Sequence, residues 1–251
     1  MTKSLLSGGV IAGAVTGLAV ALLQFFLIQP LIVEAERYET GELVLMGVAQ
    51  DDPSGSSGDT VLSAHDAHDA DDEFSVVVRS GLTVLTLVLT WSGFALVAGA
   101  ALATHRALWG PTSISVPALA LSGFAAFALS PSLGLPPELP GMQAADLSDR
   151  QIWWVMTAAA TVAGFFLASG VESWPGRFGA LALIVAPYLL GAPQPPASVP
   201  VIPPDLAALY SARALGLSLI GWLALASLLF RLMPEDGREQ PTAVAEAVDT
   251  R

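Results

Sequence analysis

The sequence is dominated by long apolar stretches without a charged residue, the first of which covers residues 4–33. A helix that crosses a membrane needs about 20 consecutive, mainly apolar residues. Charged residues make up only 13% of the chain, whereas a soluble domain has about 25%. They are also concentrated between the apolar stretches. These features exclude an ordinary water-soluble enzyme and predict an all-α fold, a polytopic membrane helix bundle.

The apolar stretches predict a single transmembrane domain over residues 1–231, followed by a polar tail over residues 232–251 that we expect to be disordered in the cytoplasm. Six spans are favoured. Five are the alternative, because one stretch is short and contains Pro187, so that it either crosses as a kinked helix or dips in and returns. The predicted spans are residues 5–28, 80–104, 115–133, 151–171, 178–191 and 207–230.

The distribution of charge favours an orientation with both termini in the cytoplasm. Lys and Arg near span ends are enriched on the cytoplasmic side, and with six spans this arrangement places six of the ten basic residues there. The net charge of −12 then falls on the outer side, largely in an acidic loop over residues 34–79. We therefore expect a multi-pass protein of the cell membrane. The scarcity of basic residues also excludes a phosphate-binding surface for nucleic acid.

Gly9, Gly13 and Gly17 recur every four residues in the first span and form one smooth helix face. Small residues at this spacing allow a second helix to approach closely. An intramolecular contact is favoured over a homodimer seam.

A cluster of His and Asp residues precedes the second span, in the sequence AHDAHDADDE at residues 64–73. The chain has no cysteine, so a metal site must use imidazole and carboxylate groups, which suit divalent Co, Ni, Zn or Mn. The alternative is an acidic loop adapted to high salt. The candidate metal ligands are His65, Asp66, His68, Asp69 and Asp72.

Several other residues are candidates for the entrance or the path of an ion. Pro30 predicts a kink or an end of the first helix, and Glu34 and Glu36 follow it, either in a short interfacial helix or as carboxylates at a pore entrance. Inside the spans Gln24 is the main polar candidate. Glu138 lies among the prolines and glycines of residues 133–142, which predict a rigid, non-helical path.

Three motifs in the middle of the chain resemble the CbtA family of predicted cobalt transporter subunits: GLPPELPG at residues 134–141, AADL at 144–147 and RQIWW at 150–154. QPLIVEAERYE at residues 29–39 and APYLLGAPQP at 186–195 fit the same order, so the resemblance covers residues 1 to about 231. The residues that carry the central motifs are Pro136, Pro137, Glu138, Pro140, Asp146, Arg150, Gln151, Trp153 and Trp154.

The resemblance implies a membrane subunit of a Co²⁺ uptake transporter linked to vitamin B12 biosynthesis. It also implies a partner, a small single-span subunit (CbtB) with a His-rich end, and about five spans. Co²⁺ is then the transported ion, and we expect no tightly bound cofactor. The sequence contains neither a catalytic constellation nor a nucleotide-binding P-loop, so we do not expect an enzyme. The alternative function is a membrane scaffold or metal-binding subunit that does not itself transport.

Overall fold

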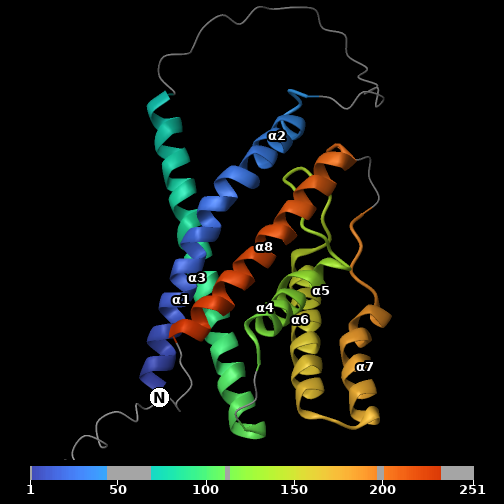
Figure 1. Ribbon diagram of the computed structural model, residues 1–251. Coiled ribbons are helices and arrows are strands. Elements are labelled where there is room, and N and C mark those ends of the chain that lie inside the picture. Colours follow the sequence, from blue (N-terminus) through green and yellow to red (C-terminus); the bar gives the residue numbers. More distant parts are fainter. Residues whose placement is uncertain (1, 44–68, 111–113, 197–200, 233–251) are drawn as a thin grey trace, which may run out of the picture.

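The computed structural model describes residues 2–43, 69–110, 114–196 and 201–232 (Figure 1). Every regular element within these residues is helical, which confirms the predicted fold class. The elements are α1 (Thr2–Leu27), α2 (Gln29–Glu39), α3 (Asp69–Trp109), α4 (Val116–Phe124), the π-helix η1 (Ala125–Leu129), α5 (Ser130–Ser132), α6 (Leu147–Gly170), α7 (Trp174–Leu190) and α8 (Pro204–Leu232).

Four helices of the described part are long and apolar enough to cross a membrane. They are Leu6–Leu27, Val77–Trp109, Leu147–Gly170 and Pro204–Leu232. Two further apolar segments, Val116–Ser132 and Trp174–Leu190, are shorter, and they correspond to the third and fifth spans predicted from the sequence. A multi-pass membrane protein is therefore supported, while the number of six spans and the cytoplasmic location of both termini stay predictions.

Helix α1 crosses α3 near the middle of both helices (Figure 1). A Cβ atom built on Gly13 would lie 2.3 Å from the Cα of Ser92, and one on Gly17 would lie 2.6 Å from the Cα of Val88. Only glycine permits this approach, because any larger residue would overlap the backbone of α3. The predicted intramolecular role of the glycine face is confirmed.

The core where α1, α3, α4 and α8 meet is built around Trp222 of α8, which is 2% exposed. Its indole lies 5.9 Å from the ring of Trp91 and stacks on Phe127 with the ring centroids 5.6 Å apart. Gly123 and Gly221 leave room for these rings, since a Cβ on either would lie less than 2.5 Å from an indole carbon. Apolar area and close aromatic packing together fix this part of the bundle.

The segment that enters the bundle as α4 becomes a π-helix at η1 and ends after the single turn of α5, which contains Pro131. Residues 133–146 then follow a non-helical path to α6, as the prolines predict. Gly141 in this loop has a φ of +79°, a conformation that favours glycine. Asp146 stands at the N-cap of α6. Within the described residues, however, its side chain makes no capping hydrogen bond.

The predicted break at Pro30 is also present. Helix α1 ends at Leu27, and α2 begins with Pro30 in its first turn, a position where the missing N–H of proline has no cost. Leu31 and Ala35 are buried, with Ile32 and Tyr38 packed beside them. The short helix that the sequence offered as one alternative is therefore present, and its apolar face packs against the bundle.

Candidate functional site

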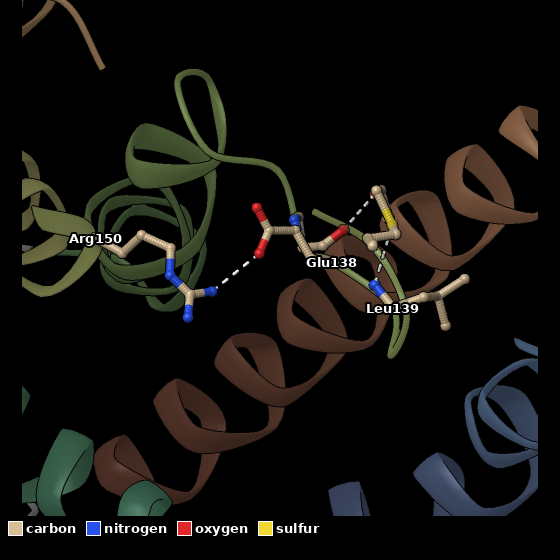
Figure 2. A network of polar contacts seen from close by, with 6 residues as sticks. Glu138, Leu139 and Arg150 are labelled. Atoms are coloured by element: carbon tan, nitrogen blue, oxygen red, sulfur yellow. Dashed lines mark hydrogen bonds and ion pairs between the residues drawn. The ribbon is translucent and has the colours of Figure 1, made fainter. Parts of the chain in front are cut away.

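An ion pair between Glu138 and Arg150 lies where the proline-rich loop meets the start of α6 (Figure 2). Nη1 of Arg150 donates a hydrogen bond of 2.9 Å to Oε2 of Glu138. The two side chains are 35% and 18% exposed, respectively. A charge-assisted hydrogen bond of this kind is stronger than one between neutral groups. The pair therefore fixes the direction of the Glu138 carboxylate while leaving it in contact with the surface.

This ion pair lines a cavity of about 240 Å³. The other lining residues are Pro131, Leu135, Pro136, Pro137, Trp153 and Trp154. Six of the nine motif residues chosen from the sequence thus surround one cavity. Pro140, Asp146 and Gln151 do not line it, and their side chains are exposed. We call this space the Glu138 cavity.

Trp153 is a buried residue in the lining of the Glu138 cavity. Its side chain is 2% exposed, and its Nε1–H donates a hydrogen bond of 3.1 Å to the carbonyl oxygen of Pro131. Gly134 makes room for the ring, because a Cβ there would lie 2.3 Å from Cζ2 of Trp153. Trp154 is partly exposed beside it, as expected for an aromatic residue near a membrane surface.

Two distant helices hold the loop of the cavity in place. Leu139 is buried in a small apolar cluster with Leu31 and Ala35 of α2 and with Leu206 of α8. In addition, Oγ of Ser211 in α8 donates a hydrogen bond of 2.9 Å to the carbonyl oxygen of Pro137. The motifs at residues 29–39 and 134–141, which are far apart in the sequence, therefore pack against each other.

The other carboxylate and amide candidates lie outside the cavity lining. Glu34 is exposed, and Oε1 of Glu36 lies 3.6 Å from Nη1 of Arg79, an exposed ion pair that links α2 to α3. Gln24 is half-buried in α1. None of the three lines the Glu138 cavity or the apolar cavity described below. Their roles at an entrance or along a path stay predictions.

The candidate metal ligands of the acidic loop fall at the edge of the described structure. His65, Asp66 and His68 lie outside the described residues, and Asp69 and Asp72 belong to the first turn of α3. Within the part that the structure describes, no three His, Cys, Asp or Glu side chains come together to hold a metal ion. The proposed capture site thus remains a prediction from the sequence.

Two features were missed by the sequence reasoning. One is a group of hydroxyls from Ser130, Thr161 and Tyr188, of which the first two are buried and the third is partly buried. The other is an apolar cavity of about 590 Å³ between α3, α4, α6 and α8, with His105 in its wall. Neither has a sequence signal, since both depend on how helices pack side by side.

The comparisons with known proteins agree with the motifs. The model of one protein family, described as a probable cobalt transporter subunit (CbtA), matches residues 2–233, nearly the whole chain. No curated protein and no solved structure matches the chain. The family match includes the Glu138 cavity and all four long apolar helices. On this evidence the chain belongs to the CbtA family of probable cobalt transporter subunits.

Proposed function

We propose that the chain is the membrane subunit through which Co²⁺ enters the cell, and that the Glu138 cavity is the entrance of its path. The observation that carries this proposal is the position of Glu138, a partly buried carboxylate in a cavity lined by the motif residues of a cobalt transporter family. A carboxylate at the mouth of a pathway favours cations. The chain then acts as a transporter subunit and not as an enzyme.

The geometry suggests how Glu138 receives an ion and releases it. Arg150 engages Oε2 of Glu138 through a single hydrogen bond in the described contacts, so Oε1 remains for a metal ion. The guanidinium neutralises much of the carboxylate charge and keeps the site from binding a divalent ion too tightly. Conduction requires this balance, because an ion that binds too strongly does not leave. Arg150 thus sets the affinity of Glu138.

Capture of Co²⁺ before it reaches Glu138 is assigned to the acidic loop. His65 and His68, with Asp66, Asp69 and Asp72, offer imidazole and carboxylate ligands of the kind that bind first-row divalent ions. The negative charge of the loop also raises the local concentration of cations. In this scheme the loop lies outside the cell, and six spans place both termini in the cytoplasm.

The word subunit in the family description implies a second component. We assign this role to a small single-span protein with a His-rich end, the CbtB-like partner, which shares the cell membrane with this chain and delivers or accepts the metal ion. The imported cobalt serves vitamin B12 biosynthesis. Uptake should therefore depend on both proteins.

Accumulation of radiolabelled Co²⁺ tests the proposal in cells that lack other cobalt importers. Cells expressing the chain and its partner should accumulate cobalt, cells expressing either alone should not, and excess Ni²⁺ should compete poorly. Glu138→Gln should lower uptake. Asp149→Asn is the matched control, because Asp149 is an exposed acid in the first turn of α6 that does not line the cavity. If a correctly inserted chain gives no accumulation with its partner, a scaffold or metal-binding role replaces transport.

A further inference from the structure

Three hydroxyl groups form a cluster next to the residues that line the Glu138 cavity. Oγ of Ser130 lies 2.6 Å from the hydroxyl of Tyr188 and 2.8 Å from Oγ1 of Thr161. The three residues belong to α5, α7 and α6, respectively, and Ser130 and Thr161 are 6% and 2% exposed. The cluster thus joins three elements inside the helix bundle.

The cluster adjoins the cavity through two of the residues that line it. Pro131 follows Ser130 in the chain, and the ring of Trp153 packs edge-on against the ring of Tyr188, with the ring centroids 5.7 Å apart. Trp153 thus contacts both the Glu138 cavity and the hydroxyl cluster.

The cluster has more short oxygen–oxygen distances than protons to occupy them. The Tyr188 hydroxyl also lies 2.7 Å from the carbonyl oxygen of Ser130, and Oγ1 of Thr161 lies 2.8 Å from the carbonyl oxygen of Thr157. Three hydroxyls carry one proton each, with two lone pairs, yet four such distances connect them with each other and with the two carbonyls. Together with the two carbonyls, the cluster therefore presents more oxygen lone pairs than protons.

The backbone beside the cluster is irregular, which brings carbonyl oxygens within reach of side chains. The π-helix η1 ends directly before Ser130, and Pro131 follows. The carbonyl oxygens of Ser130 and Pro131 accept hydrogen bonds from the side chains of Tyr188 and Trp153. π-Helical turns are frequent at functional sites, and interrupted helices in membrane transporters offer carbonyl oxygens to ions. The Ser130 carbonyl is thus a fourth oxygen of the cluster.

We propose that Ser130, Thr161 and Tyr188 form a cation site within the bundle that receives the divalent ion leaving Glu138, with the Trp153 ring next to both positions. The inference rests on the proposed function and adds the step that follows the entrance. Neutral hydroxyl and carbonyl oxygens bind a divalent ion weakly, so the ion stays briefly and moves on. Such weak binding at successive sites is what conduction requires.

Transport kinetics distinguish the role of Glu138 from the role of the hydroxyl cluster. Tyr188→Phe and Thr161→Val each remove one oxygen with little change in shape, and we expect the maximal rate of Co²⁺ uptake to fall on the order of tenfold while the concentration for half-maximal uptake changes little. Glu138→Gln should instead raise that concentration. Thr83→Val is the matched control for Thr161→Val, because the Thr83 hydroxyl donates to the carbonyl oxygen of Arg79 in its own helix α3, and Thr83 lines neither the Glu138 cavity nor the cluster. Wild-type maximal rates in Tyr188→Phe and Thr161→Val, at normal membrane levels, would overturn the inference.

A binding measurement tests whether Co²⁺ binds at the hydroxyl cluster, independently of transport. The full chain in lipid nanodiscs is titrated with Co²⁺, which quenches the fluorescence of nearby indoles. The contribution of Trp153 to the quenched fluorescence is obtained by comparison with Trp153→Phe. In a Glu138→Gln background we expect Trp153 still to be quenched, and Tyr188→Phe to remove that quenching. Equal quenching with and without Tyr188 contradicts the inference. A wild-type chain that fails to transport Co²⁺ with its partner contradicts the proposed function instead.

Discussion

Arg213 of α8 donates a hydrogen bond of 3.0 Å from Nη1 to the carbonyl oxygen of Leu27, the last residue of α1. The carbonyl groups at the end of a helix lack partners within the helix and carry partial negative charge. The guanidinium satisfies one of them at the point where Pro30 interrupts the chain. A charged residue inside a predicted span is therefore explained by the break between α1 and α2.

Replacing Arg213 by Met should destabilise the protein by about 1.5–3 kcal/mol, the usual contribution of a hydrogen bond to a charged group. Thermal unfolding in detergent measures the change. Arg177→Met is the control, since Arg177 is exposed and its guanidinium contacts only the ring of Trp174 in the described interactions. Equal melting temperatures for the two variants would show that the Arg213 contact does not stabilise the break.

Gly13→Ala should destabilise the crossing of α1 and α3. The added methyl group would overlap the Cα of Ser92 at 2.3 Å, and forcing a helix pair apart costs about 1–3 kcal/mol. Gly93→Ala in α3 is the matched control, because among the described residues nothing lies within 4 Å of a Cβ at that position. The control should be neutral or slightly stabilising, as alanine favours a helix more than glycine. Chemical denaturation of both variants measures the change in the free energy of unfolding.

The ion pair of Glu138 and Arg150 should show a coupling free energy of about 1 kcal/mol, near the upper end for partly exposed pairs. A double-mutant cycle with Glu138→Gln and Arg150→Met measures it. Each single variant should be less stable than the wild type, because it leaves a charged or polar group of the pair without its partner. Additive effects in the cycle would mean that the two side chains do not interact in solution.

Replacing both His65 and His68 by Ala should raise the Co²⁺ concentration for half-maximal uptake by about tenfold, since the loop would lose its imidazole ligands. The maximal rate should stay near the wild-type value, because the Glu138 cavity is unchanged. Uptake measured over a range of Co²⁺ concentrations gives both numbers. An unchanged half-maximal concentration would identify the acidic loop as an adaptation to salt and not as a metal site.

The sequence by itself determined the class of the protein, several local features and the family. Hydropathy over about 20 residues fixes where a helix can cross a membrane, and four of the six predicted spans have the length and composition for it. The missing N–H of proline fixes the break at Pro30 and the non-helical path after α5. The Gly9, Gly13 and Gly17 face also follows from residue size alone. Each of these is a property of neighbouring residues.

The tertiary structure decided which of the candidate residues meet. Glu138, Arg150 and Trp153 surround one cavity, whereas Gln24, Glu34 and Glu36, which looked equally promising in the sequence, do not line it. Tyr188 reaches Ser130 across 58 residues, and Arg213 reaches Leu27 across 186. No local pattern specifies such pairs, because they depend on which helix faces pack together. Close packing of glycine and aromatic residues between helices determines which helix faces meet.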